Sequence, residues 1–252
     1  MSKDDADGIP EAVREYVTET PVMTHSLFPA MAAAENLTTV VRLIDDWDAN
    51  GKTRTVSDVT LLRAAIESSA RTVWLLSPTD RSVRRGRALI MTKSEVLAQK
   101  KYLEKVLASQ RDSGDPAYIG QVEADLQKAR TVLDELDSVP GSPTIEQIIE
   151  LSSAWVDETA VNPQHAPMRD SSRSLYAIAS GIAHGYTWTT RHMRGVEDIF
   201  NITADFLYAA VSLLSAAVIL HEAQAAGTSS IGNRCPAHIR PVAKQLRERY
   251  VD

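Results

Sequence analysis

The chain has 252 residues, of which 44% are hydrophobic and 24% are charged, and its formal net charge is −6. This is the composition of a globular protein that is long enough to bury a full core. The negative charge disfavours broad, non-specific binding to nucleic acid, although it is compatible with a local basic patch. The single cysteine, Cys235, excludes an internal disulfide and fits a reducing cytoplasm.

The longest apolar run is Phe206–Leu220, which is too short to span a bilayer and is flanked by Asp205 and His221. We expect a buried core helix here and no association with a membrane. The chain begins with MSKDDADG, which lacks the apolar segment of a signal peptide. These features predict a cytoplasmic location.

Several helix starts are marked by a small or capping residue before a proline, because proline loses no hydrogen bond at the first helical position. The four pairs are Ser77-Pro78, Asp115-Pro116, Ser142-Pro143 and Cys235-Pro236. No comparable series of alternating β-branched strands is found. In chain order, we predict helices over about 11–17, 30–47, 57–76, 79–111, 117–136, 144–157, 168–192, 196–226 and 237–250. The predicted fold is all-α, a bundle of about eight to nine helices in one domain over residues 1–252.

The segment 93–137 is rich in Lys, Glu, Asp, Gln and Leu, with a narrow apolar stripe at Val96, Tyr102, Leu103 and Val106. A turn at 112–116 makes this segment an antiparallel helical hairpin. Two interpretations stay open. Either the hairpin projects from the bundle and contacts a protein partner, or its helices are ordinary amphipathic members of the bundle.

The common catalytic signatures for nucleotide binding, metal binding and serine hydrolysis are missing from the sequence. Four histidines lie in or beside predicted loops and pair with no carboxylate at ligand spacing: His25, His165, His192 and His238. We therefore expect no organic cofactor and no catalytic metal.

The strongest polar pattern lies in the predicted helix 168–192. At about 100° per residue, one stripe of this helix holds Arg173, Ser180, His184 and Arg191, with Tyr176 beside it. The other positions are small or apolar, which predicts burial on most sides. Gly181 and Gly185 are costly in a helix, so we expect them to permit the close approach of a neighbour near His184.

The predicted helix 57–76 carries a second polar pair, Arg63 and Glu67, whose spacing of four residues places them on one face. Buried charges need partners, so we expect this pair to face Ser180 and His184 across the core. Such a layer either fixes the register of the helices or forms a catalytic site.

A basic cluster starts the predicted helix 79–111, with Arg81, Arg84, Arg85 and Arg87 within two turns. The cluster is either a solvated face or a phosphate-binding site, since guanidinium groups make bidentate contacts with phosphate.

The two polar helices resemble a known family. An R-x-x-x-E helix (Arg63, Glu67) that ends in an apolar run at Trp74, followed by a Y-x-x-x-S-x-x-x-H-G helix (Tyr176 to Gly185), resembles HEPN-like helical proteins of bacteria. The stretch from Ser77 to the arginine cluster is similar to actinobacterial members. The resemblance covers roughly 37–87 and 171–220.

This resemblance implies a metal-independent ribonuclease of toxin or defence type, or at least RNA or nucleotide binding. It makes His184 the group that moves a proton, with Ser180 and Tyr176 hydrogen-bonding beside it. Arg63 or Arg173 would stabilise the developing charge, with Glu67 completing the candidate catalytic set. The chain departs from the family's closely spaced arginine and histidine, since Arg173 precedes His184 by eleven positions.

The resemblance also implies a homodimer, and the predicted helix 196–226 offers small residues for close packing at Ala209-Ala210 and Ala216-Ala217. The alternative function is a non-enzymatic module that dimerises or binds a protein, in which the Arg63, Glu67, Ser180 and His184 layer is structural.

Overall fold

The computed structural model describes residues 8–17, 20–51, 55–110, 115–159, 167–224 and 237–250. Within these ranges the regular elements are nine α-helices and one 3-10 helix, and no strand occurs. The predicted all-α fold is therefore confirmed. The chain divides into two compact units, unit 1 (Met1–His25 and Asp80–Pro143) and unit 2 (Ser26–Thr79 and Thr144–Asp252).

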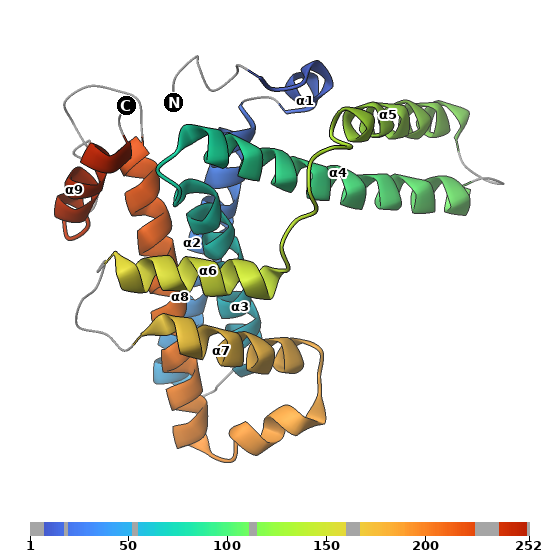
Figure 1. Cartoon of the computed structure of the whole chain (residues 1–252). Coiled ribbons are helices and arrows are strands. Elements are labelled where there is room, and N and C mark those ends of the chain that lie inside the picture. The colour runs from blue at the N-terminus through green and yellow to red at the C-terminus, as the bar shows by residue number, and fades with distance from the viewer. Residues whose placement is uncertain are drawn as a thin grey trace. The chain divides into compact units, whose positions relative to one another are not determined.

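Unit 1 is built on a helical hairpin. Its elements are α1 (Glu11–Tyr16), the first turn of α2 (Pro21–Asn50), α4 (Arg81–Gln110) and α5 (Pro116–Glu135). Helices α4 and α5 run antiparallel, and α1 packs on α5 (Figure 1). Two buried apolar clusters hold the hairpin together, one around Val96 and Val132 and one around Leu103. Tyr102 departs from the predicted apolar stripe, because 61% of its surface is exposed.

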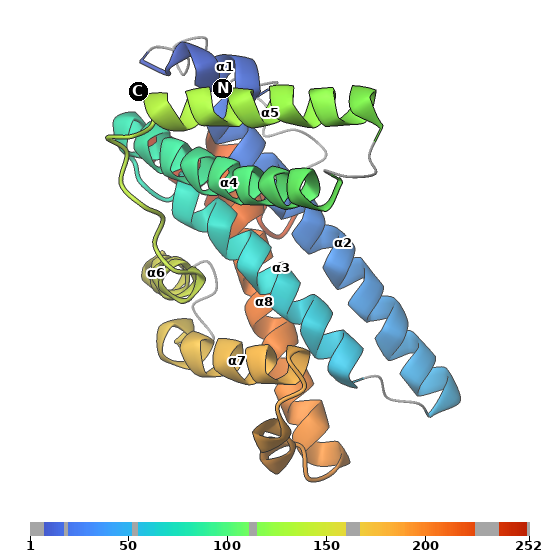
Figure 2. The same ribbon diagram turned by 90° about the vertical axis from the view of Figure 1, so that its right-hand side faces the viewer.

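Unit 2 contains most of the helices. Its elements are the rest of α2, α3 (Thr55–Leu76), α6 (Ile145–Glu158), α7 (Met168–Ala183), the 3-10 helix η2 (Thr187–His192), α8 (Val196–Gln224) and α9 (Arg240–Tyr250). Helix α8 packs on α3, and α6 and α7 lie across α3 (Figure 1). Helix α2 runs beside α3 (Figure 2), and the Thr72 hydroxyl of α3 donates to the Ser26 carbonyl of α2 over 3.0 Å. Fully buried side chains such as Leu62, Leu75, Phe206 and Leu213 fill the contact between α3 and α8.

The predicted helix bounds are close for most elements, but the second helix is longer than predicted. The prediction began this helix after Pro29, whereas α2 begins at Pro21 and contains Pro29. The first backbone hydrogen bond of this helix runs from the Thr24 N–H to the Thr20 carbonyl over 3.0 Å, so Pro21 is the first helical residue. A proline at the first position is favourable, and the one inside the helix costs a backbone hydrogen bond.

The proline-based helix starts are partly wrong. Asp115 does cap α5, accepting from the Ala117 N–H over 3.0 Å. By contrast, α4 starts after Asp80, whose carboxylate accepts from the Ser82 N–H over 2.7 Å, and not at Ser77-Pro78. The pair Cys235-Pro236 lies outside the described residues.

Helix α6 (Ile145–Glu158) also begins two positions later than Ser142-Pro143 suggests. Thr144 accepts from the Gln147 N–H over 3.3 Å, and the Gln147 side chain accepts from the Thr144 N–H over 2.9 Å. This reciprocal pair is a capping box, so Thr144 is the residue that starts the helix.

Within the residues that the structure describes, two stretches are long and apolar enough to cross a membrane, Glu11–Trp47 and Val196–Gln224, with mean hydropathy of 1.2 and 1.9. Length and composition alone are weak evidence, because a core helix passes the same test. Half of the apolar window in Val196–Gln224 is buried inside the protein. The absence of membrane association and the cytoplasmic location both stay predictions.

Replacing Thr144 with alanine should lower the free energy of unfolding by about 1 kcal/mol, because one orphan amide at the start of α6 loses its acceptor. Urea denaturation followed by circular dichroism measures this change. Ser142→Ala is the matched control, and it should change the stability by less than about 0.5 kcal/mol. A larger loss from Ser142→Ala than from Thr144→Ala would show that the start of α6 is misassigned.

Candidate functional site

Arg63 and Glu67 of α3 form a polar trio with Tyr176 of α7. The Arg63 Nε–H donates to Glu67 Oε1 over 2.7 Å, and Arg63 Nη2 donates to the Tyr176 hydroxyl over 3.3 Å. The Arg63 guanidinium also lies 5.2 Å from the centre of the Tyr176 ring, in a cation–π contact. The predicted pairing of Arg63 with Glu67 is confirmed.

The trio is partly buried, since the side chains of Arg63 and Glu67 expose 20% and 26% of their surface. Burial by itself lowers the pKa of Arg63, but the hydrogen bonds and charge of Glu67, helped by Tyr176, outweigh it and raise that pKa. Each member of the trio is engaged by another member. The trio therefore joins α3 to α7.

Two other predicted residues do not join this trio. Arg173 lies toward α6, with its Nη1 3.7 Å from Glu150 Oε2 and 63% of its side chain exposed. Ser180 is partly buried, and its carbonyl accepts from the His184 N–H over 3.0 Å. Among the described hydrogen bonds, none connects Arg173, Ser180 or His184 to the trio.

The predicted continuation of this helix to His192 is wrong, because α7 ends at Ala183. Gly185 follows with a φ of +69°, a left-handed conformation that favours glycine. The Tyr186 N–H then donates back to the Gly181 carbonyl over 2.9 Å, the long bond of a Schellman motif. Arg191 consequently belongs to η2 and not to a stripe of α7.

His184 caps the end of α7 and its side chain is exposed. The predicted buried layer of Ser180 and His184 is therefore wrong. Its ring lies 5.8 Å from the ring of Tyr186, which is also exposed. A ligand at the surface has access to this imidazole.

Gly181 permits the close approach that the sequence suggested, although the neighbour is η2. A Cβ atom at this position would lie 2.6 Å from both Trp188 Cζ2 and Thr189 Cγ2. No atom lies within 4 Å of the Cβ position of Gly185, so glycine is favoured there by its left-handed backbone conformation and not by a close neighbour. Because residue 181 has no side chain, η2 can fold back on α7.

We call the exposed side chains of Tyr186, Trp188, Arg191, His192 and Arg194 the η2 surface. Tyr186 and Trp188 expose 55% and 42% of their surface, and the other three are exposed as well. The Trp188 and His192 rings meet edge to face at 5.9 Å. The segment 184–194 contains two arginines, two histidines and no acidic residue.

A cavity of about 320 Å³ adjoins the η2 surface. It is lined by Ile178, Arg191, His192, Arg194, Asp198, Asn201 and Ile202. Asp198 caps the segment by accepting from the Arg194 N–H over 3.1 Å, and the Arg194 Nε–H donates to the Arg191 carbonyl over 2.9 Å. The cavity thus combines cationic groups with an amide and one carboxylate. Sequence reasoning missed it, although the alternation of aromatic and basic residues in HGYTWTTRHMR was a usable signal.

Unit 1 holds an arrangement that the sequence did not predict. His25 is 2% exposed, with Nε2 2.8 Å from Thr92 Oγ1 and Nδ1 3.3 Å from Glu95 Oε1. No carboxylate lies at ligand spacing from His25 in the sequence, and the partner that the structure shows, Glu95, is 70 positions further along the chain. The order hydroxyl, imidazole and carboxylate has the form of a catalytic triad, but Thr92 is fully buried and donates to the Ala88 carbonyl. The arrangement therefore ties the start of α2 to α4.

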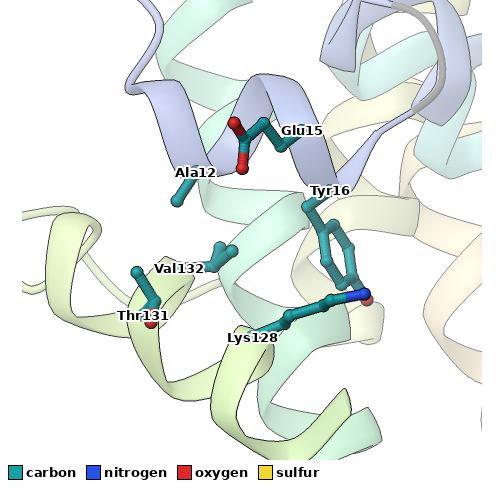
Figure 3. Close-up of a pocket in the computed structure, with 6 residues that line it drawn as sticks. All are labelled: Ala12, Glu15, Tyr16, Lys128, Thr131 and Val132. Carbon is teal, nitrogen blue, oxygen red and sulfur yellow. The ribbon is translucent and has the colours of Figure 1, made fainter. Parts of the chain in front are cut away.

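A groove of about 300 Å³ lies between α1 and α5 in unit 1 (Figure 3). Ala12 and Val132 form its apolar part, while Glu15 and Lys128 approach it from opposite sides. Tyr16 lines one end, and its hydroxyl already donates to Gln99 Oε1 over 2.6 Å. Burial, together with the negative charge of Glu95, raises the pKa of Tyr16. The groove therefore combines two apolar side chains with one acidic and one basic side chain.

The arginine cluster at the start of α4 is less exposed than a solvated face would be. Arg84 is 6% exposed, and Arg81, Arg85 and Arg87 are partly buried. Burial lowers the pKa of Arg87. Of the two interpretations of this cluster, the solvated face is wrong.

In the part of the chain that the structure describes, no group of three or more His, Cys, Asp or Glu side chains is placed to hold a metal ion. Comparison of the chain with protein-family models, with curated proteins and with solved structures found no match.

Replacing Glu67 with alanine should lower the free energy of unfolding by about 1–2 kcal/mol, because Arg63 keeps its partly buried charge and loses its anion. Thermal and urea denaturation measure the loss. Glu150→Ala removes the acid facing the more exposed Arg169 and Arg173, so it should cost less than about 0.5 kcal/mol. Equal effects of the two substitutions would contradict the assignment of the trio.

Gly181→Ala should destabilise the protein by about 1–2 kcal/mol, since the clash with Trp188 and Thr189 outweighs the gain in helix propensity. The Trp188 ring should move outward and shift the tryptophan emission to longer wavelength. Gly120→Ala is the control. Gly120 lies in α5 with nothing near its Cβ position, so this change should stabilise by up to about 1 kcal/mol. The same sign for both substitutions would disprove the close contact.

Proposed function

We propose that this protein binds single-stranded RNA through the η2 surface. The resemblance to HEPN-like proteins supports the proposal, because it implies RNA or nucleotide binding. One observation carries the proposal. Two exposed aromatic rings, Tyr186 and Trp188, stand beside exposed Arg191 and Arg194 in a segment without acidic residues.

The chemistry of these side chains suits an unpaired strand. Bases that are not paired stack on aromatic rings, and this stacking tolerates any sequence because every base has a flat face. Arginines bind the phosphates between such bases, often with two hydrogen bonds at once. In the adjoining cavity, Asn201 and Asp198 offer hydrogen-bonding groups for a base edge or a ribose 2′-hydroxyl.

His184 is the candidate for proton transfer if the bound RNA is cleaved. Its exposed ring adjoins Tyr186, so RNA stacked there would reach it. Cleavage by the 2′-hydroxyl needs a base and nearby cations for the developing charge. Because Arg63 is engaged by Glu67 and Tyr176, we assign the cationic part to Arg191 or Arg194 instead.

The proposal is tested by fluorescence anisotropy with a labelled twelve-nucleotide single-stranded RNA. Trp188→Ala should weaken binding about 5- to 150-fold, which corresponds to about 1–3 kcal/mol for a lost stacking contact. Arg191→Gln with Arg194→Gln should reduce the slope of log affinity against log salt by about 1.4, at 0.7 per phosphate contact. Tyr102→Ala and Arg169→Gln are controls with similarly exposed side chains and should bind as the wild type does.

Incubation of the wild type and His184→Ala with total RNA, without metal, separates binding from cleavage. Cleavage that only the wild type performs would support His184 as the proton-transfer group. Binding without cleavage leaves an RNA-binding protein. If no RNA binds at low salt, or if the control variants bind as weakly as Trp188→Ala, the proposed function is wrong.

A further inference from the structure

An apolar groove of about 260 Å³ lies where α2 and α8 meet in unit 2. Its walls are formed by Leu27 and Met31 of α2 and by Leu214 and Val218 of α8. Leu27 and Met31 expose 37% and 53% of their surface, so the groove is open to solvent on the side of α2. Pockets for drug-sized ligands begin at about 300 Å³, and this groove therefore suits a somewhat smaller molecule.

Three alanines leave the space between these walls, namely Ala30, Ala34 and Ala217. Ala34 is exposed at the mouth of the groove, whereas Ala217 is fully buried and belongs to its floor. Ala217 is also one of the small residues of α8 that were expected at a dimer contact. The exposed fraction of all four is 3% or less, so they pack within the protomer, and the homodimer stays a prediction.

The end of the groove nearest the terminus of α8 is polar. Leu214, Val218 and Glu222 follow one another at intervals of four residues along one face of the helix, and His221 lies beside Glu222. Both polar residues belong to the last turn of α8, which ends at Gln224. The carbonyl groups at the end of a helix carry partial negative charge and favour a cation. Among the described residues that line the groove, none is a lysine or an arginine.

The Nε2 atom of His221 is buried and, within the part of the chain that the structure describes, has no hydrogen-bond partner. A buried polar atom without a partner costs free energy, and a ligand that supplies the partner recovers it. Burial lowers the pKa of His221, with the charge of Glu222 acting in the opposite direction, so the imidazole is neutral at neutral pH. With its proton on Nδ1, a neutral imidazole accepts a hydrogen bond at Nε2.

Glu222 adds a full negative charge to the same end of the groove. Its side chain is partly buried, and no hydrogen bond or ion pair joins its carboxylate to another residue that the structure describes. An ionised carboxylate only accepts hydrogen bonds. The polar end of the groove therefore offers acceptors and negative charge, while the rest of its lining is apolar.

We propose that this groove binds an apolar organic cation, a protonated primary amine on an alkyl or aryl body. The ammonium group donates to the Glu222 carboxylate and to His221 Nε2, while the body lies between the apolar walls. Charge complementarity singles out this occupant, because every polar group in the lining attracts a donor with positive charge. The proposal is independent of RNA binding, since no residue of the η2 surface lines the groove.

Other occupants fit the groove less well. A fatty acid would bring its carboxylate against Glu222, and the two like charges would repel each other. The apolar face of another helix, or the hydrocarbon of a bilayer, would cover the walls of the groove. Either would remove water from Glu222 and supply no donor to it or to His221.

Isothermal titration calorimetry of the full chain tests the proposal with three probes that share one alkyl chain: octylamine, octanol and octanoate. Octylamine, which like a lysine side chain stays protonated at about pH 7.5, is the probe that matches the proposed ligand. It should bind roughly tenfold more tightly than octanol, because hydrogen bonds to charged groups are the stronger ones. Octanoate should bind more weakly than octanol, since its charge meets Glu222.

Glu222→Gln removes the charge and should weaken octylamine binding roughly tenfold, while octanol binding changes by less than about twofold. Glu222→Lys should reverse the order of octylamine and octanoate. His221→Leu should weaken both octylamine and octanol, because each donates to Nε2. Ala34→Leu should abolish the binding of all three probes, because it fills the mouth of the groove. Glu123→Gln removes an exposed acid of α5 and is the control that should leave the affinities unchanged.

Circular dichroism checks that each variant is folded. The proposal is overturned if octylamine binds the wild type no more tightly than octanol does, or if Glu222→Gln or Ala34→Leu leaves octylamine binding unchanged. A dimer that Met31→Glu dissociates would also overturn it, as would a chain that floats with phosphatidylcholine vesicles, because the groove would then have another occupant.

Discussion

Two glycines one turn apart determine the shape of the end of α7. Gly185 takes a φ of +69°, which lets the backbone close a Schellman motif and leave the helix. Gly181 lacks the side chain that would strike Trp188 and Thr189, so the departing chain folds back as η2. The exposed rings and cations of η2 follow from these two local properties. A side chain at position 185 would strain the turn, and a side chain at position 181 would push η2 away from α7.

Most helices follow from apolar periodicity and caps, and the failures have a physical cause. The bounds of α3 and α8 agree with prediction because their buried rows are long and continuous. The end of α7 was missed because Arg191 continues the stripe of Arg173, Ser180 and His184 at helical spacing, and no proline interrupts it. A glycine inside a helix costs only about 1 kcal/mol relative to alanine, so its presence alone does not show that the helix ends there.

In the candidate sites, the sequence predicts contacts between neighbouring positions but not contacts between distant ones. Arg63 and Glu67 pair as their spacing of four residues requires, whereas their contact with Tyr176 spans 113 positions of the chain. The buried contact between His25 and Thr92 spans 67 positions and has no local signal at all. His184 was expected inside because its helix was expected to continue. Once the helix stops, the same residue lies at the surface, where a ligand can reach it.

The net charge of −6 constrains how a polyanion would bind this chain. Because the chain is acidic overall, the proposed contact with phosphate would rely on the few cations of the η2 surface, chiefly Arg191 and Arg194. With so few phosphate contacts, the electrostatic contribution to affinity is small and depends little on salt. The larger part must then come from stacking on Tyr186 and Trp188, which needs unpaired bases. Duplex RNA hides its base faces, so under the proposed function the same charge balance that would weaken binding in general would also favour single strands.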